Sequence, residues 1–533
     1  NTTMKTYNKL KWLTLAGIGL FIASCTDKWE DHYVTQPATM DGTQTIAEYI
    51  GSQPDLSVFA QMLTISGYDS ILSAPQTFTV WAPANAALSN INLQDGELVR
   101  NMVMNHISRF SYPTSNLSSK VIYMLDKKFI TFIRGDGNFK FGGIDLISEK
   151  SNIALANGIV HHINGFVPYK DNLWEYILKA NELDSLRNFL NSQSEYIFDP
   201  KNSVEIGTNE FGQAIYDSVI TFSNPILDKI GYLHLEDSVY SAILPDNKAW
   251  KDAYDKVKSN YKTLAVDGGA PRQRYLSQLA LVRNLVFRNE IVAVEGLDSL
   301  VSTTGSKFMN PAYLFTNATP VSLSNGIGFV TDSLRYKAAE SWQQPIVLEA
   351  ENSNYGRSYQ YANLFVRSSL GSSLDGQVSE SKYLLVEPTT VSNNTMSSVT
   401  FPIPNTLSGK YNVYCVLVPG TIVEGAAPKA NKVKFYLSYL NNSGTQINDA
   451  PIDAANKIST PGRVAAIFTS EDATISKMFV TKVEFPYCNI MEENDPSSMI
   501  TIKLKVENAT RITETVRFNR SLRIDYILLE PAQ

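Results

Sequence analysis

The residue types that most often do chemistry are scarce in this sequence, and cysteine is the clearest case. The 533 residues include three cysteines, Cys25, Cys415 and Cys488, and no CxxC pair. Zinc sites and disulfide frameworks need more thiols at closer spacing. Cys415 and Cys488 could form one bridge in an oxidising compartment or remain two buried free thiols. The sequence leaves both alternatives open.

Enzyme motifs are also missing. The sequence contains no GxSxG elbow, HExxH pair, phosphate-binding loop or dinucleotide fingerprint. His162 directly follows His161, so in a strand the two side chains would lie on opposite faces and would not clamp a metal. Spacing does not exclude a glycosidase pair of carboxylates, because such partners can lie far apart in the sequence.

Residues 1–24 have the pattern of an export signal. A lysine-rich start precedes the apolar run Trp12–Ser24, whose 13 residues are fewer than the roughly 20 that span a membrane. The run ends in Ile-Ala-Ser-Cys25, which resembles the lipobox of bacterial lipoproteins. That resemblance implies cleavage before Cys25 and lipidation of its thiol. An ordinary signal peptide that ends near a cysteine is the alternative.

Residues 25–43 form the expected linker behind the lipid. Asp27, Glu30 and Asp31 follow Cys25 closely and resemble the acidic export signal that sends Bacteroidota lipoproteins to the outer face of the outer membrane. Several acyl chains would anchor the protein stably, whereas one chain binds marginally. We therefore expect an outer-membrane protein that faces the cell exterior and contacts the membrane through its lipid anchor. A plain solvated linker is the alternative.

Three landmarks occur twice, in the same order, between residues 44 and 343. The first precedes an amphipathic stretch with helical spacing, and Asp55 and Gly67 are its expected start and stop signals in the first copy. The second reads as a buried strand stopped by proline, followed by a helix capped near Asn85 or Asn247. The third is an Asn-Gly turn into a strand. The pairs are Thr45–Ile50 with Asn172–Ile177, Thr79–Ala87 with Ser241–Ala249, and Asn157–His161 with Asn325–Phe329.

Together these landmarks resemble the fasciclin module, whose two sequence boxes match TFTVWAPANAAL and NGIVHHINGFVP in the first copy. His106 also lies where the family has a histidine between the boxes. We therefore expect one fasciclin-like module at residues 44–170 and another at 171–343. The resemblance implies adhesion or matrix contact, and it implies that His106 and His161 are buried, hydrogen-bonded residues rather than catalytic ones.

The second copy departs from this pattern. Phe329 stands in the place of His161, and the intermediate histidine is replaced around Asn284. The offset between the copies grows from 127 residues at the first landmark to 162 at the second, so about 35 residues are inserted. We expect this insertion, around Glu195–Gln213, to be a surface loop.

From Ile346 onward the predicted helices disappear. Short alternating segments such as KYLLVEP, KVKFYLSYL and MITIKLKVE are separated by Asn, Ser, Gly and Pro. Regular short strands of this kind indicate an antiparallel β-sandwich or jelly roll, which we place at residues 344–533. The predicted fold class is α+β: two tandem fasciclin-like modules followed by an all-β sandwich.

The ends of this region, Ile346–Glu351 and Leu522–Pro531, resemble the galactose-binding-like jelly rolls among carbohydrate-binding modules. The resemblance implies a structural calcium held by Glu349, Glu351 and Asp525, and oxygen ligands of this kind suit Ca²⁺. No other cofactor is expected. Solvated or salt-bridged carboxylates are the alternative. The region is longer than such modules usually are, so insertions or another sandwich topology stay open.

Tyr355, Tyr359 and Tyr361 are the candidate ligand contacts. Aromatic rings stack on the apolar faces of sugars, and these three residues follow the opening strand closely. The alternative is that they pack beneath a loop.

Charge narrows the class of partner. A formal net charge of −6 over 533 residues argues against nucleic acid, because phosphate binding needs concentrated lysine and arginine. We predict a non-catalytic surface lipoprotein that binds glycan or glycoprotein as an accessory part of an outer-membrane nutrient-uptake system built on a TonB-dependent transporter. The alternatives are an adhesin that binds protein or matrix partners through its fasciclin modules, and a hydrolase hidden in the β domain.

Overall fold

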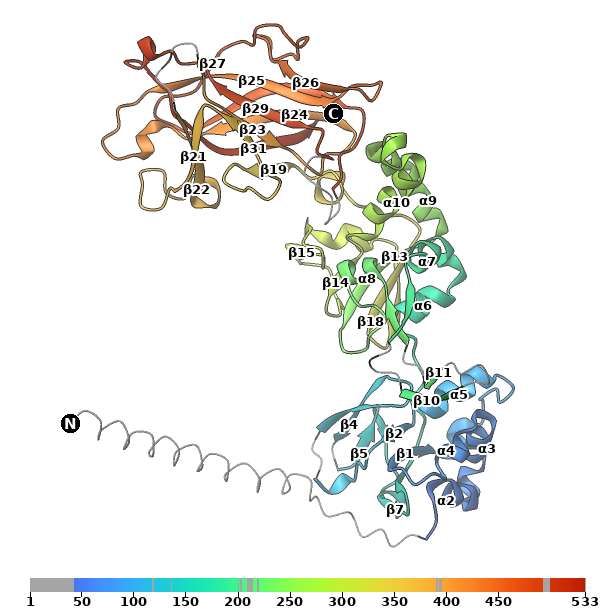
Figure 1. The fold of residues 1–533 in the computed structure, drawn as a ribbon. Coiled ribbons are helices and arrows are strands. Elements are labelled where there is room, and N and C mark those ends of the chain that lie inside the picture. Colours follow the sequence, from blue (N-terminus) through green and yellow to red (C-terminus); the bar gives the residue numbers. More distant parts are fainter. Residues whose placement is uncertain are drawn as a thin grey trace, which may run out of the picture. The chain divides into compact units, whose positions relative to one another are not determined.

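Figure 1 shows the chain as a computed structural model. The structure describes residues 43–532 apart from gaps at 117–118, 136, 200, 202–203, 209–213, 218–219, 390–391, 393–394 and 492–498. The predicted signal peptide, the lipidation site Cys25 and almost all of the predicted linker lie outside the described residues. The chain divides into two compact units, Asn1–Asp171 and Asn172–Gln533. Within the described ranges, no helix is both long and apolar enough to cross a membrane.

The first unit contains a small mixed sheet whose buried side packs against short helices. Strands β1 and β8 run parallel at its centre, and the order across the sheet is β2-β1-β8-β7. A second, antiparallel sheet has the order β3-β4-β5-β6. The elements are α2 (Ile46–Ser52), η1 (Pro54–Leu56), α3 (Ser57–Ser66), α4 (Tyr68–Ile71), β1 (Phe78–Pro83), η2 (Asn85–Leu88), α5 (Gly96–Met104), β2 (Ile107–Arg109), η3 (Thr114–Asn116), β3 (Ser119–Tyr123), β4 (Phe129–Arg134), β5 (Phe139–Phe141), β6 (Ile144–Asp145), η4 (Ser148–Lys150), β7 (Ile153–Leu155) and β8 (Gly158–Ile163).

Helix boundaries in this unit follow the sequence signals except at Asp55 and Asn85. A capping box opens α2, and α3 ends at Gly67, whose φ is 74°. Asp55 does not cap α3 as expected, because it lies in the preceding turn η1. The N–H of Val58 in the first turn of α3 instead donates to Oδ1 of Asn85, 2.9 Å away. Asn85 therefore caps the helix before it in the chain, not the one after it.

The second module repeats this sheet with the order β14-β13-β18-β17 and a parallel β13–β18 pair at its centre. Ile243 pairs with Phe329 as Trp81 pairs with His161, so Phe329 does stand in the place of His161. The elements are α6 (Leu173–Lys179), η5 (Asn181–Leu183), α7 (Asp184–Asn191), β9 (Glu195–Phe198), β10 (Val204–Thr208), β11 (Ala214–Asp217), β12 (Ile220–Ser223), α8 (Pro225–Ile230), β13 (Tyr240–Pro245), α9 (Asn247–Val257), η6 (Lys258–Tyr261), η7 (Ala265–Asp267), α10 (Gly269–Val282), β14 (Val286–Arg288), β15 (Ser299–Val301), β16 (Lys307–Met309), η8 (Pro311–Phe315), β17 (Thr319–Leu323), β18 (Gly326–Thr331) and η9 (Ala338–Glu340).

The hydrogen bonds of the central strand locate the missing histidine of the second module. The N–H of Ile243 donates to the carbonyl of Leu285 at 2.9 Å, the same bond that Trp81 makes to His106 in the first module. Leu285, rather than the neighbouring Asn284, is therefore the counterpart of His106.

The insertion in the second module is not the surface loop that we expected. It forms two two-stranded sheets, β9 with β12 and β10 with β11. Tyr196 on β9 pairs with Phe222 on β12, and the ring of Phe222 lies 5.7 Å from that of Trp174. Aromatic and β-branched residues in segments such as EYIF and ITFS favour strands over loops.

From Ile346 the second unit is an antiparallel β-sandwich, as predicted, apart from a short parallel β25–β30 pair. One sheet has the order β21-β22-β31-β24-β28, with β19 also paired to β31, and the other has the order β20-β23-β29-β25-β26, with β27 and β30 paired to β25. The elements are β19 (Ile346–Glu349), β20 (Ser358–Gln360), β21 (Ala362–Ser368), η10 (Ser379–Ser381), β22 (Lys382–Pro388), β23 (Ser398–Pro402), β24 (Gly409–Leu417), η11 (Gly420–Ile422), β25 (Ala430–Leu440), β26 (Gln446–Pro451), β27 (Phe468–Thr469), β28 (Ser476–Phe485), β29 (Lys503–Asn508), η13 (Ile512–Glu514), β30 (Phe518–Asn519) and β31 (Leu522–Ala532).

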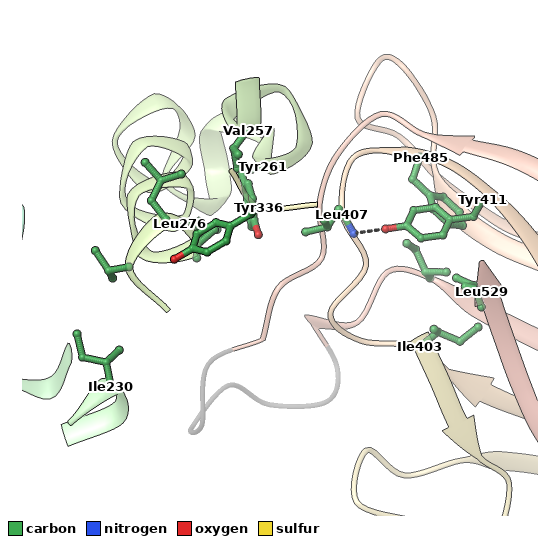
Figure 2. Packing of buried hydrophobic residues seen from close by; sticks show 14 of the residues in the cluster. Ile230, Val257, Tyr261, Leu276, Tyr336, Ile403, Leu407, Tyr411, Phe485 and Leu529 are labelled. Carbon is green, nitrogen blue, oxygen red and sulfur yellow. Dashed lines mark hydrogen bonds between the residues drawn. The ribbon is translucent and has the colours of Figure 1, made fainter. Parts of the chain in front are cut away.

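The second module and the sandwich share one hydrophobic core within the second unit. Figure 2 shows buried Tyr261 beside the module helices and buried Leu407 and Tyr411 on the sandwich side. The N–H of Ser408 donates to the carbonyl of Asn260 at 2.8 Å across the same junction. Residues 172–533 are therefore one compact unit, and the domain boundary predicted between residues 343 and 344 stays a prediction.

Both described cysteines are free thiols. Cys415 on β24 is buried and Cys488 is half-buried. Burial raises the pKa of the Cys488 thiol to about 11 and that of Cys415 further still. Both groups therefore stay protonated at neutral pH, and of the two alternatives left open by the sequence the structure has the free thiols.

Candidate functional site

An apolar row crosses the outer face of the six-stranded sheet. Phe479 on β28 pairs with Tyr414 on β24. Leu528 on β31 pairs with Tyr414 on one side and with Val347 on β19 on the other. Phe479 and Val347, at the two ends, are 39% and 51% exposed. We call these four residues the aromatic row. They lie on four adjacent strands, so the row is about 14 Å long at ordinary strand spacing.

An ion pair lies at the aromatic row, with its ammonium group over the Tyr414 ring. The rings of Tyr414 and Phe479 lie 5.5 Å apart. Nζ of Lys477 lies 4.3 Å from the ring centroid of Tyr414 and 2.7 Å from Oε1 of Glu530. An aromatic surface next to a cation and a carboxylate can stack on the apolar face of a sugar and hydrogen-bond to its hydroxyl groups.

The sequence predicts these strands but not the row. Tyr411, Val413 and Cys415 on β24 are buried in the core, and Tyr414 lies on the opposite face. A register shift between Val413 and Tyr414 then aligns Tyr414 with Phe479. Alternation within β24 was the available signal, but which residues line up across strands depends on the bulges of the sheet.

A second bulge lies at Asp525 on β31. Ile524 pairs with Leu417 and Ile527 with Cys415, so β31 has one residue more than β24 between these pairs. On its other side, β31 pairs with β22 before Asp525 and with β19 after it. Asp525 thus lies where the strand changes partner, and bulges at such points redirect side chains.

The structure brings the three predicted calcium ligands near one another. Burial, together with the nearby carboxylates of Glu349 and Glu351, raises the pKa of Asp525 to about 7, although the N–H of Ser379 donates to it at 3.1 Å. Oγ of Ser379 donates to Oε1 of Glu349 at 2.6 Å. The Oε2 atoms of both glutamates are buried and have no hydrogen-bond donor among the described residues.

These carboxylates have the chemistry of a calcium site but not its complete geometry. Hard oxygen atoms with unbalanced negative charge are the ligands that Ca²⁺ prefers. Within the described part of the chain, however, no three carboxylate, histidine or cysteine side chains are placed to hold a metal ion. Glu351 lies beyond the end of β19, so it does not continue the strand face of Glu349 as we expected. Serine or backbone oxygens would have to complete the ligand set.

The three candidate tyrosines lie along one edge of the sandwich. Tyr359 on β20 pairs with Val399 in the second sheet and is 55% exposed. Tyr361, 56% exposed with a φ of 51°, lies where the chain crosses to the first sheet, and Tyr355 is half-buried in the preceding loop. No ring contact joins these three among the residues described. They do not belong to the aromatic row, and their ligand role stays a prediction.

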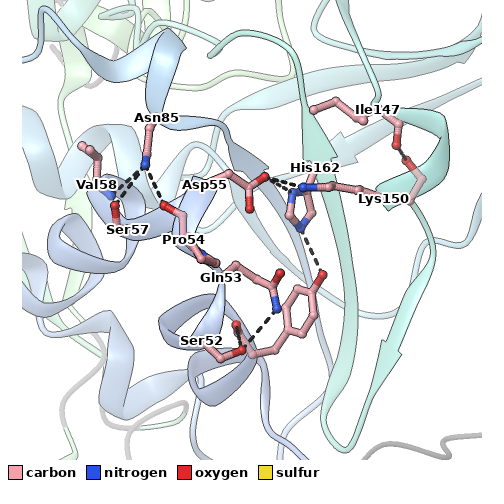
Figure 3. Close-up of polar contacts among 12 residues, drawn as sticks. Ser52, Gln53, Pro54, Asp55, Ser57, Val58, Asn85, Ile147, Lys150 and His162 are labelled. Atoms are coloured by element: carbon pink, nitrogen blue, oxygen red, sulfur yellow. Dashed lines mark hydrogen bonds and ion pairs between the residues drawn. The ribbon is translucent and has the colours of Figure 1, made fainter.

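A polar chain in the first module links His162 to α2 and η1 (Figure 3). The hydroxyl of Tyr49 lies 3.2 Å from Nε2 of His162, and Oδ2 of Asp55 lies 3.4 Å from its Nδ1. Lys150 donates to the same Asp55 oxygen at 2.8 Å. Burial and the charge of Asp55 raise the pKa of Tyr49, so its hydroxyl keeps its proton at neutral pH. The arrangement resembles a relay but lacks an activated nucleophile.

His106 and His161 are buried and hydrogen-bonded, as predicted. Nδ1 of His106 donates to the carbonyl of Met102 at 2.7 Å, and its Nε2 accepts from the N–H of Val167 at 3.0 Å. Nε2 of His161 lies 3.0 Å from the carbonyl of Tyr112. Burial lowers the pKa of both imidazoles to about 4, which keeps them neutral. Their role is to hold the fold together.

Comparison with known proteins identifies a fasciclin domain at residues 54–167. Two curated proteins are similar over part of the chain. Stabilin-1 of Homo sapiens is 25% identical over 177 residues, which is 31% of this chain and 7% of the relative. Stabilin-1 of Mus musculus is 25% identical over 167 residues, 29% of this chain and 6% of the relative. The chain therefore spans less than a tenth of the length of these relatives.

Solved structures resemble separate parts of the chain. A FAS1 domain pair from the insect cell adhesion molecule fasciclin I is 14% identical and covers 54% of this chain and 98% of its own, with a TM-score of 0.20. The xylan-binding domain from CBM 22 is 18% identical and covers 35% and 93%, with a TM-score of 0.20. A family 35 carbohydrate-binding module from Clostridium thermocellum is 11% identical and covers 36% and 99%, with a TM-score of 0.18. At these scores, the resemblances assign no ligand to this chain.

Proposed function

We propose that this protein is a non-catalytic, lipid-anchored surface protein that binds glycan chains along the aromatic row. The observation that carries the proposal is the alignment of Phe479, Tyr414 and Val347 across the outer face of the six-stranded sheet. The row is long enough for about three sugar rings at the strand spacing of a sheet. The ion pair of Lys477 and Glu530 supplies a hydrogen-bond donor and an acceptor at its border.

A glycan array tests this proposal directly. The chain with Cys25→Ser, which cannot be lipidated, is screened against neutral and acidic oligosaccharides, and hits are measured by calorimetry. Phe479→Ala should weaken binding about fivefold or more, because one stacked ring contributes about 1 kcal/mol or more. Phe365→Ala is the matched control, since this exposed phenylalanine lies on the edge strand β21 of the same sheet. Equal loss in both variants, or no sugar binding at all, would contradict the proposal.

Placement on the outer membrane and partnership with a TonB-dependent transporter belong to the same proposal. Their support is the lipobox ending at Cys25 and the acidic residues behind it. A pull-down of the tagged lipoprotein from its own outer membrane in mild detergent, with mass spectrometry of the partners, tests both. A co-purifying transporter would support an uptake role, whereas recovery with matrix or host proteins would favour adhesion.

The adhesin alternative has its own observation. The hairpin of β3 and β4 in the fasciclin domain exposes Val121, Tyr123 and Phe129, with 59%, 52% and 44% of each residue exposed. Register places all three on one face, because Val121 pairs with Thr131 and Tyr123 with Phe129. An exposed apolar strand face suits a protein partner.

Calcium at Glu349, Glu351 and Asp525 remains part of the main proposal as a structural ion.

A further inference from the structure

A pocket of about 410 Å³ opens at the junction of the second module and the sandwich, within the second unit. Its lining comes from both sides: Tyr261 and Leu276 belong to the module, and Ile346 and Asn405 belong to the sandwich. Figure 2 shows Tyr261 and Leu276 beside this junction. The volume falls in the range of small-molecule sites.

The described lining of this pocket carries positive charge and no negative charge. Among the described residues of the lining, Arg283, directly after α10, is the one charged residue, and none is a carboxylate. Its guanidinium is exposed and makes no ion pair with any described residue. A cation without a partner in a ligand-sized hollow favours an anionic ligand, and guanidinium matches the planar geometry of a carboxylate.

The neutral wall of the pocket offers hydrogen bonds in fixed positions. Nδ2 of buried Asn284 donates to Oγ of Ser341 at 3.0 Å, and Oγ1 of Thr304 donates to Oδ1 of Asn284 at 2.8 Å. The indole N–H of Trp342, also in the lining, is buried and has no acceptor among the described residues. Hydroxyl groups beside an indole ring suit a polyhydroxylated ligand.

The aromatic row leads to this pocket. Val347 is the last residue of the row on β19, and it also lines the pocket. A glycan chain lying along the row would therefore bring its end to Arg283. We propose that the pocket binds the terminal carboxylate-bearing sugar of an acidic glycan, of the uronic or sialic acid class. This inference rests on the proposed glycan function and names its substrate class.

Titration with single sugars separates the pocket from the row. Glucuronic acid and N-acetylneuraminic acid are titrated into the chain with Cys25→Ser, with glucose and galactose as neutral counterparts, and binding is followed by ligand-observed NMR. At least one acid should bind, and the neutral sugars should bind at least tenfold more weakly. Arg283→Gln should reduce acid binding at least tenfold, and Arg283→Lys should restore part of it.

Two further variants make the result specific. Arg274→Gln removes an equal charge from the exposed surface of α10, outside the pocket lining, and should leave the affinity unchanged. Trp342→Ala removes the indole ring from the pocket lining, and it should weaken acid binding. Equal binding of acidic and neutral sugars, or acid binding that Arg283→Gln does not alter, would overturn the proposal.

Failure of this inference is distinguishable from failure of the glycan function. Phe479→Ala should weaken binding of neutral oligosaccharides along the row about fivefold or more while leaving the affinity for the single acidic sugars unchanged. If oligosaccharides bind but the acids do not, glycan binding along the row is supported and the assignment of the pocket is wrong. If the acids bind in an Arg283-dependent way but no oligosaccharide does, the pocket is a separate small-ligand site, and the link to the row is wrong.

Discussion

At the scale of single residues, one asparagine in each module organises the turn before the central strand. Oδ1 of Asn157 accepts from the N–H of Ile46 at 2.8 Å, at the start of α2. Its Nδ2 donates to the carbonyls of Leu72 and Ala74. Asn325 makes the equivalent three bonds in the second module. The Asn-Gly landmark is thus a buried bridge between segments as well as a turn.

The glycine that follows each of these asparagines is required for a separate reason. Gly158 has a φ of 144°, and a Cβ there would lie 1.9 Å from the carbonyl oxygen of Phe78. Gly326 meets the carbonyl of Tyr240 in the same way, at 1.8 Å. Any side chain at either position would force the two parallel strands apart, so both copies need glycine there.

Asp525 gives a prediction about pH at this scale. Its pKa of about 7 in the folded protein lies above the ordinary value near 4. The folded state therefore holds this proton more tightly, and in EDTA the contribution of Asp525 to the free energy of unfolding should fall as pH rises from about 4 to 7 and then level off. Asp525→Asn should remove that fall and stabilise the metal-free protein at pH 8 by roughly 2 kcal/mol. Urea unfolding between pH 4 and 8 measures both effects.

Controls connect this prediction to the proposed calcium site. Glu424→Gln, at an exposed position in the sandwich, should keep the pH dependence of the parent. If calcium binds, adding it at pH 7.5 should stabilise the parent by mass action but not Asp525→Asn. A stability difference between Asp525→Asn and the parent that does not grow between pH 4 and 7 in EDTA would contradict the raised pKa.

At the scale of elements, the insertion in the second module should be dispensable. Tyr196 and Phe222 face each other across β9 and β12, and all four residues of β9 are exposed. Replacing residues 197–221 with Asn-Gly joins Tyr196 to Phe222 through a two-residue turn. The melting temperature of the second unit should change by less than about 3 °C, because little buried apolar surface is lost. Differential scanning calorimetry measures this change.

A nearby capping residue provides the contrast. Asn224 is buried, caps α8 and donates to the carbonyl of Leu190 at 2.8 Å. Asn224→Ala should lower the melting temperature more than removal of the whole hairpin, because it leaves several buried polar groups unpaired. The opposite order would mean that the hairpin belongs to the core.

At the scale of the whole molecule, the two compact units should unfold in two separate transitions. Asn157→Ala and Asn325→Ala remove equivalent buried bridges, each at a cost of roughly 2–4 kcal/mol. Asn157→Ala should shift the transition of the first unit and leave the other in place. Asn325→Ala should shift the second transition as a whole, including the sandwich, because the module and the sandwich share a core. Calorimetry with near-ultraviolet circular dichroism follows the two transitions.

This prediction tests whether the second module and the sandwich share one core. Three transitions, with Asn325→Ala moving one of the last two, would mean that the sandwich unfolds independently of the second module. The double variant should show the sum of the single effects, since the two sites lie in different units.

The sequence by itself determined the local elements of this protein. The Gly67 helix end, the Asn-Gly turns and the alternating strands after Ile346 are short-range patterns, and each was found where it was expected. Burial of His106 and His161 also followed from the family resemblance. These features depend on residues a few positions apart or on a recognisable motif, so a single sequence contains enough information to predict them.

Tertiary structure decided what depends on register and long-range partners. Asn85 caps an earlier helix, and Asp55 pairs with Lys150 instead of capping α3, because the partners lie far apart in the chain. The aromatic row exists because bulges align residues from four strands, and one-residue shifts in pairing decide which side chains meet. The pocket at Arg283 forms where the second module packs against the sandwich. Such juxtapositions have no local signature, because folding, not sequence proximity, brings their residues together.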